Sequence, residues 1–89
     1  MNEHSVPHPC PDIVFRQTGE ESVLLHLRTK EYYSLNLTGT VFWQLLDGSH
    51  SLADCAQRMA EDFEVPPGQA LQDLIELAGE LQAAGLIDA

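Results

Sequence analysis

The sequence predicts an α+β domain in which a three-stranded antiparallel meander precedes three helices, in a winged helix-turn-helix-like layout. Alternating apolar residues broken by short turns fill residues 12–36, and segments with helical spacing follow to the end. The segment EYYSLNLTGTVFWQLLDG, residues 31–48, changes from a strand pattern to a helix pattern. At 89 residues the chain has room for one domain.

The N-terminal part of the chain predicts a tail and then the three strands. Residues 1–11 hold three of the prolines and no periodicity, so we expect a flexible tail ahead of a domain at residues 12–89. Alternation at residues 13–16, 23–27 and 31–36 indicates the strands. Consecutive strands with short turns pair as antiparallel neighbours, which leaves the third at an edge. Such an edge is a template for another chain.

The first two helices have recognisable starts. Thr38 is the expected cap of a helix over residues 39–46, with Gly48 as its stop. Ser51 with Asp54 forms an Asp variant of the capping box at the start of the second helix. Met59 lies on the apolar stripe of that helix, where we expect it to fill the core.

The third helix is expected to begin near Pro66 and Pro67 and to end near Ala84, before Gly85. Its apolar side chains cover about half of its circumference, more than a core-facing helix requires. Two interpretations stand equally: the helix is deeply buried, or one flank lines a groove. The apolar positions are Ala70, Leu71, Leu74, Ile75, Leu77, Ala78, Leu81 and Ala84, and the wider flank borders Asp73 and Glu80.

The formal charge of −10 excludes some partners and favours others. No base follows Arg58, so the C-terminal third is anionic. Binding to nucleic acid or anionic membranes depends on clustered Lys and Arg, so neither is expected. A cationic peptide would be attracted, although acidic residues also keep small domains soluble.

No motif predicts catalysis, a cofactor or a metal site. Phosphate-binding loops, zinc-protease and hydrolase motifs are absent, so we expect no enzyme activity. Cys10 and Cys55 have no metal-ligand spacing, and a disulfide is not expected. A small enzyme or metal protein that uses these cysteines and the histidines is a weaker hypothesis. Without a signal sequence or a membrane-length apolar run, we predict a cytoplasmic protein.

The order of three segments resembles a known family. YYSLNLTGTVFWQLLDG is followed by SLADCAQRMAEDFEVP and by a long helix that ends in LQAAGLI. Together they resemble the PqqD-like proteins, the recognition elements for ribosomally made peptide natural products (RiPP recognition elements), over residues 13–87. The aromatic strand and the LLDG turn are most similar to the stand-alone leader-binding subunits of lasso peptide biosynthesis. PqqD proper, a peptide chaperone that serves a radical SAM enzyme, is the near alternative.

The resemblance implies that a leader peptide adds as a strand along the third strand and presses against the third helix. On the strand, it implies contacts with Glu31, Tyr32, Tyr33, Ser34, Leu35 and Asn36. On the helix, it implies contacts with Ala70, Asp73, Leu74, Leu77, Glu80 and Leu81. Core packing is the competing explanation for Tyr33 and Leu35, whereas Tyr32 and Ser34 point to the opposite face and would engage the guest through their backbones.

We therefore predict a non-catalytic adaptor that binds the leader of a precursor peptide and presents it to processing enzymes. By resemblance, those partners are a leader peptidase of the cysteine-protease type and a lasso cyclase. A winged-helix interaction domain, dimeric through the same edge strand, is the competing class.

Overall fold

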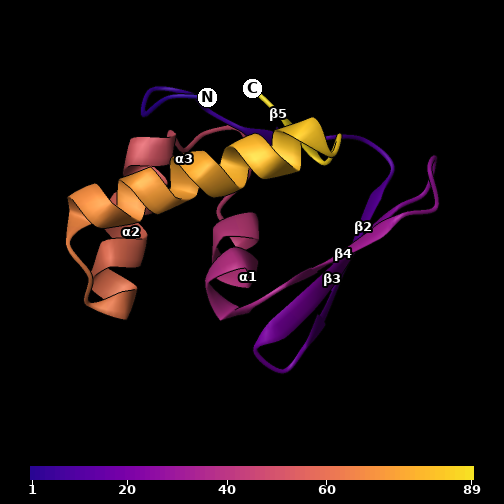
Figure 1. The fold of residues 1–89 in the computed structure, drawn as a ribbon, viewed down its shortest axis with the longest axis horizontal. Coiled ribbons are helices and arrows are strands. Elements are labelled where there is room, and N and C mark those ends of the chain that lie inside the picture. Colours follow the sequence, from indigo (N-terminus) through magenta and orange to yellow (C-terminus); the bar gives the residue numbers. More distant parts are fainter.

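The computed structural model describes all 89 residues and contains the expected sheet followed by three helices. The strands β2 (Ile13–Thr18), β3 (Glu21–His26) and β4 (Tyr32–Leu35) form an antiparallel sheet in the order β2-β3-β4. The predicted meander is confirmed, and β4 is an edge strand. The helices lie on one side of this sheet (Figure 1).

The first helix, α1 (Leu37–Gln44), begins two residues earlier than its pattern predicted. Its cap is Asn36, whose side-chain oxygen accepts a hydrogen bond from the Gly39 N–H at 3.0 Å. The prediction of Thr38 as the cap was wrong, because Asn36 is also a strong capping residue and β4 ends just before it. Thr38 instead donates its hydroxyl to the Asn36 side-chain oxygen, at 2.9 Å.

The other two helices begin where their signals indicated, and α3 also ends there. The start of α2 (Leu52–Phe63) is a capping box, in which the Ser51 hydroxyl accepts from the Asp54 N–H and the Asp54 carboxylate accepts from the Ser51 N–H, both at 3.1 Å. Proline begins α3 (Pro67–Ala83), where its missing N–H is no loss. Gly85 follows with a φ of +76°, the left-handed conformation that ends many helices.

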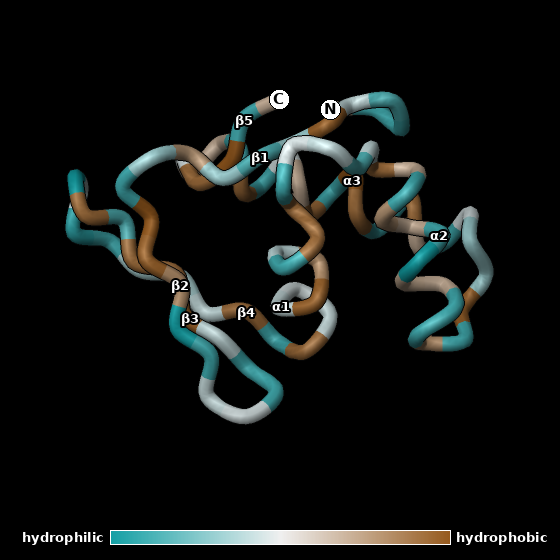
Figure 2. The backbone as a smooth tube through the Cα atoms, turned by 180° about the vertical axis from the view of Figure 1, so that it is seen from behind, coloured by the Kyte–Doolittle hydropathy of each residue, from teal (hydrophilic) through white to brown (hydrophobic).

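The segment that we expected to be a tail lies against the domain. His8–Pro9 forms β1, which pairs with β5 (Ile87–Asp88), so the two termini lie near each other (Figures 1 and 2). Farther upstream, the carbonyls of Ser5 and Glu3 accept hydrogen bonds from the first two N–H groups of α2, at 2.9 and 3.0 Å. These N–H groups have no partner within a helix, so the segment satisfies them.

The core lies between the sheet and the helices. Leu24 of β3, Phe42 of α1 and Leu52 of α2 are fully buried there. One buried polar contact joins sheet to helix: the hydroxyls of Ser22 and Thr40 share a hydrogen bond of 2.7 Å. Apolar residues recur in the strands and in α1, while the turn between β2 and β3 is polar (Figure 2). The shared core and the contact between Ser22 and Thr40 hold the sheet and α1 as one unit. This packing fixes the position of the end of β4 relative to the helices.

Candidate functional site

The free edge of β4 presents the backbone groups of two residues. The His26 N–H donates to the Glu31 carbonyl at 2.9 Å, so the backbone C=O group of Glu31 points toward β3. Hydrogen-bonded and non-bonded pairs alternate along an antiparallel ladder, and the register continues with Tyr32 opposite Leu25. The backbone groups of every second residue after Glu31, namely Tyr33 and Leu35, therefore also point toward β3. The N–H and C=O groups of Tyr32 and Ser34 must therefore point to the open edge.

The side chains of β4 alternate between the two faces of the sheet. Leu35 is buried at 6% exposure and belongs to the core, and half-buried Tyr33 packs against that core. Tyr32, at 71% exposure, and Ser34 lie on the opposite face. Core packing thus explains why the side chains of Tyr33 and Leu35 point inward. The open edge of β4 presents mainly backbone N–H and C=O groups.

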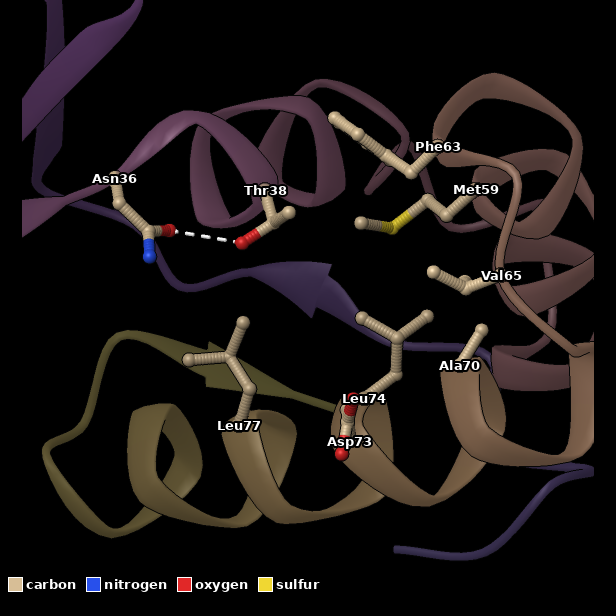
Figure 3. A pocket seen from close by; sticks show the side chains of 9 residues that line it. All are labelled: Asn36, Thr38, Met59, Phe63, Val65, Ala70, Asp73, Leu74 and Leu77. Atoms are coloured by element: carbon tan, nitrogen blue, oxygen red, sulfur yellow. Dashed lines mark hydrogen bonds between the residues drawn. The ribbon is translucent and has the colours of Figure 1, made fainter.

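An apolar groove of about 290 Å³ lies beyond the end of β4, between the start of α1, the end of α2 and the first half of α3 (Figure 3). Six of its nine lining residues are hydrophobic. The lining consists of Asn36, Thr38, Met59, Phe63, Val65, Ala70, Asp73, Leu74 and Leu77. A groove of this volume has room for one or two apolar side chains of a guest.

The wall that α3 contributes agrees with the second interpretation of its wide apolar face. Ala70 and Leu74 are buried where the groove meets the core, and Leu77 is half-buried on the groove side. In Figure 3 the side chains of Leu74 and Leu77 point from α3 toward α1 and α2. The excess apolar width of this helix therefore lines a groove.

The structure brings together five of the twelve residues that the resemblance implied: Asn36, Ala70, Asp73, Leu74 and Leu77. Glu80 and Leu81 do not line the groove. Glu80 is exposed one to two turns farther along α3, and Leu81 is 5% exposed within the core. Both lie seven residues after Asp73 and Leu74 and so share nearly the same face of α3, but about two turns farther along the helix axis, beyond the groove.

Sequence reasoning missed the wall formed by α1 and α2. Thr38, Phe63 and Val65 line the groove, and Met59 does so as well while remaining 5% exposed. Met59 therefore fills the core, as predicted, and also faces the groove. The available signal was the pair Phe63 and Val65, which continues an apolar pattern past the end of α2 toward Pro66.

The titrating groups whose pKa is shifted lie outside the groove. Burial, with help from Asp54 and Asp47, raises the pKa of Cys55 to about 11. Burial and nearby Asp88 also raise the pKa of Cys10. Both thiols stay protonated at neutral pH, which makes them weak nucleophiles. Hydrogen bonds from Ser49, then His50, hold the pKa of Asp47 well below its usual range in an exposed turn.

The remaining candidates for chemistry do not form a site. No group of three or more His, Cys, Asp and Glu side chains is placed to hold a metal ion. None of the helices combines the length and the apolar character that a bilayer crossing needs. The groove beside the open edge of β4 is therefore the main candidate site.

The chain matches one family model and two solved structures. The family model for coenzyme PQQ synthesis protein D (PqqD) matches residues 21–87. The solved structure of lasso peptide synthetase B1 complexed with the leader peptide is 36% identical, with a TM-score of 0.83 over 96% of this chain and 100% of that chain. TbiB1 in complex with the TbiA(beta) leader peptide shares the fold at 23% identity, with a TM-score of 0.85 over 92% of this chain and 95% of that chain. No curated protein sequence matches this chain.

Proposed function

Because the chain belongs to the PqqD family, we propose that it is a non-catalytic adaptor that binds the leader of a ribosomally made precursor peptide. The leader adds as a strand to β4, and the adaptor presents it to maturation enzymes. One observation carries this proposal: the unpaired edge of β4 runs directly into an apolar groove. The lasso peptide class is favoured by the 36% identical structure, which is a leader complex of a lasso peptide synthetase subunit.

Backbone pairing supplies the sequence-independent part of the affinity. Tyr32 and Ser34 together offer two N–H and two C=O groups at the edge, enough for up to four hydrogen bonds with a guest strand. Glu31 and Asn36 flank this stretch and mark the limits of the pairing. Leu35 and Tyr33 hold the strand on the core from its inner face.

The groove supplies the choice of leader. Side chains of a strand alternate, so every second residue of the guest faces α3 and can enter the groove. Ala70, Leu74 and Leu77 give the apolar contact there, and Asp73 borders it. Leu81 supports this wall from the core, and Glu80 extends its acidic border.

Long-range charge guides the leader to this site. The net charge of −10 and the absence of bases after Arg58 favour a basic peptide and speed its association more than they strengthen the complex. The partners in the lasso class are a leader peptidase of the cysteine-protease type and an ATP-dependent cyclase. Holding the leader raises the local concentration of the cleavage site for these enzymes.

The family match itself favours a second function of the same kind. A PqqD-type adaptor would deliver its precursor to a radical SAM enzyme, because the matching family model is that of a coenzyme PQQ synthesis protein. The same edge and groove would serve, and only the downstream enzyme would differ.

Calorimetric titration with a synthetic leader tests the proposal. A search beside the gene of this chain for a short precursor-like reading frame supplies the peptide, and a scrambled peptide of equal composition is the control. We expect saturable 1:1 binding of the leader and none of the scrambled peptide. Equal binding of both peptides, or of neither, contradicts the proposal. Faster leader cleavage by the neighbouring peptidase when the adaptor is present supports the lasso class over the second candidate.

A further inference from the structure

Asp73 is the only ionisable residue among the nine that line the groove. It takes part in none of the four ion pairs of the chain. The one basic residue in the second half of the chain, Arg58, already lies 3.6 Å from the Asp62 carboxylate. The nearest charges along α3 are those of Glu76 and Glu80, which have the same sign. The carboxylate of Asp73 therefore has no cation of its own.

At its position in α3, Asp73 does not stabilise the helix through the helix dipole or through capping. It is the seventh residue of the helix, which begins at Pro67, and it lies beyond the first turn in which an acidic side chain interacts with the helix dipole. It is also too late to cap the free N–H groups of the helix start. The remaining structural explanation is solubility, and exposed Glu76 on the same helix fulfils that role without touching the groove.

The opposite wall of the groove does not compete for a cation. The side-chain oxygen of Asn36 already accepts hydrogen bonds from the Gly39 N–H and the Thr38 hydroxyl, at 3.0 and 2.9 Å. The other lining residues from α2 and the following loop are apolar. A positive charge that enters the groove is thus attracted to one place on α3.

The neighbours of Asp73 suit the stem of a long basic side chain. Leu77 lies one turn after it and Leu74 lies next to it, and both line the groove (Figure 3). Lys and Arg bury their methylene stems on apolar surface while the charged head stays near water. The exposed carboxylate at the groove border and the apolar wall beside it match those two parts.

We propose that the peptide held in the groove carries a lysine or arginine whose charged group pairs with Asp73 while its stem lies on Leu77. This inference rests on the proposed function and deepens it: Asp73 selects one residue of the leader by direct contact. The acidic charge of the rest of the chain acts only from a distance. Contact and distant attraction differ in a measurable way, because only contact couples Asp73 to a single position of the peptide.

A double-mutant cycle, measured by calorimetry at a fixed salt concentration, distinguishes direct contact with Asp73 from long-range attraction. The protein variants are Asp73→Asn and, as the matched control, Glu76→Gln, which also removes one negative charge from an exposed position of α3. The peptides are the synthetic leader and versions in which each lysine or arginine in turn is replaced by methionine. Both protein changes lie on the surface, so neither is expected to affect folding.

We expect Asp73→Asn to weaken binding of the unmodified leader about two- to fivefold, the size of a solvent-accessible ion pair. Replacement of one particular basic residue should weaken binding to the wild type equally and have no further effect on Asp73→Asn. In Glu76→Gln that same replacement should keep its full effect.

Equal losses for Asp73→Asn and Glu76→Gln without coupling to any position would overturn the inference, as would a binding leader without lysine or arginine. In those cases the leader still binds and the proposed function stands. Absence of leader binding by the wild type would instead remove the proposed function, and this inference with it.

Discussion

The two outer strands of the sheet, β2 and β4, both leave backbone groups unpaired, yet they border different surroundings. The register places the backbone groups of Phe15 and Gln17 at the free edge of β2. At that edge the Phe15 ring stacks on Trp43, with centroids 6.4 Å apart, and the Gln17 side chain accepts a hydrogen bond from Gln44 at 3.0 Å. A second hollow lies across the outer face of the sheet, where Val14, Arg16 and Thr18 of β2 line it together with Val23, Leu25 and Tyr32, but neither Phe15 nor Gln17 lines a groove. The end of β4, in contrast, runs into the apolar groove at Asn36.

If the leader adds to β4 as proposed, this difference implies that an open edge alone does not make a recognition site. Backbone groups accept any extended chain, and they are as available on β2 as on β4. What distinguishes β4 is the flank of α3 that stands beside its end and gives alternate side chains of a guest a place to bury. Under the proposed function, affinity and choice come from different elements, and each can be removed separately.

The largest effect on leader affinity is expected from disrupting the groove. The edge of β4 would then, like that of β2, have no apolar groove at its end. Leu77→Asp replaces an apolar contact by a charge, and we expect the leader affinity to fall about 10- to 100-fold. Calorimetry measures the affinity. Ile75→Asp is the matched control, because Ile75 is equally half-buried on α3 but does not line the groove. Unchanged affinity in a folded Leu77 variant would contradict the groove.

A smaller effect is expected from blocking the backbone edge. Ser34→Pro removes an N–H that points away from β3, which an edge strand tolerates. The loss of one hydrogen bond should weaken leader binding about three- to tenfold. Gln17→Pro makes the same change on the edge of β2 and should leave the affinity unchanged, as should Ser34→Ala. Equal losses for the two proline variants would mean that the leader does not choose between the edges.

Asn36 joins the edge of β4 to the groove, because it ends the strand and caps α1. Asn36→Ala removes the cap and should lower the free energy of unfolding by about 1 kcal/mol. For a domain of this size the melting temperature would fall by about 4–8 °C. Thermal unfolding followed by circular dichroism measures this change. Asn36→Asp keeps the cap and should melt near the wild type; if it melts as early as Asn36→Ala, capping is not the reason.

The smallest effect concerns steering by the acidic residues. Raising the ionic strength from 0.05 to 0.3 M should slow association of a basic leader about two- to threefold, with little change in its release. Stopped-flow fluorescence of the single tryptophan, Trp43, near the sheet, or of a labelled leader, gives both rates. An association rate that does not depend on salt would mean that the acids only keep the protein soluble.

Much of the fold followed from local signals. The capping box at Ser51, the proline start of α3 and Gly85 after its end are short-range patterns, and all three lie where the sequence indicated. The cap of α1 was misplaced because Asn36 and Thr38 are both good capping residues two positions apart. Sequence preference does not decide between them, but the end of β4 does.

The parts of the candidate site that could be predicted are those with a local sequence pattern, namely α3 and the edge of β4. The wide apolar face of α3 indicated Leu74 and Leu77, and the strand pattern indicated the edge of β4. Phe63 and Val65 escaped prediction because their place in the groove depends on how α2 packs against α3. The hydrogen bonds of Ser5 and Glu3 to α2 escaped for the same reason, since they join segments far apart in the sequence.

Amide hydrogen exchange followed by NMR tests most directly whether a leader pairs with β4. In the free protein the amides of Tyr32 and Ser34 on β4 and of Phe15 and Gln17 on β2 all lack ladder partners and should exchange readily. At saturation with leader, we predict that exchange slows at least about tenfold at Tyr32 and Ser34 alone. Unchanged exchange at these two amides, or slowing at the β2 edge instead, would contradict strand addition to β4.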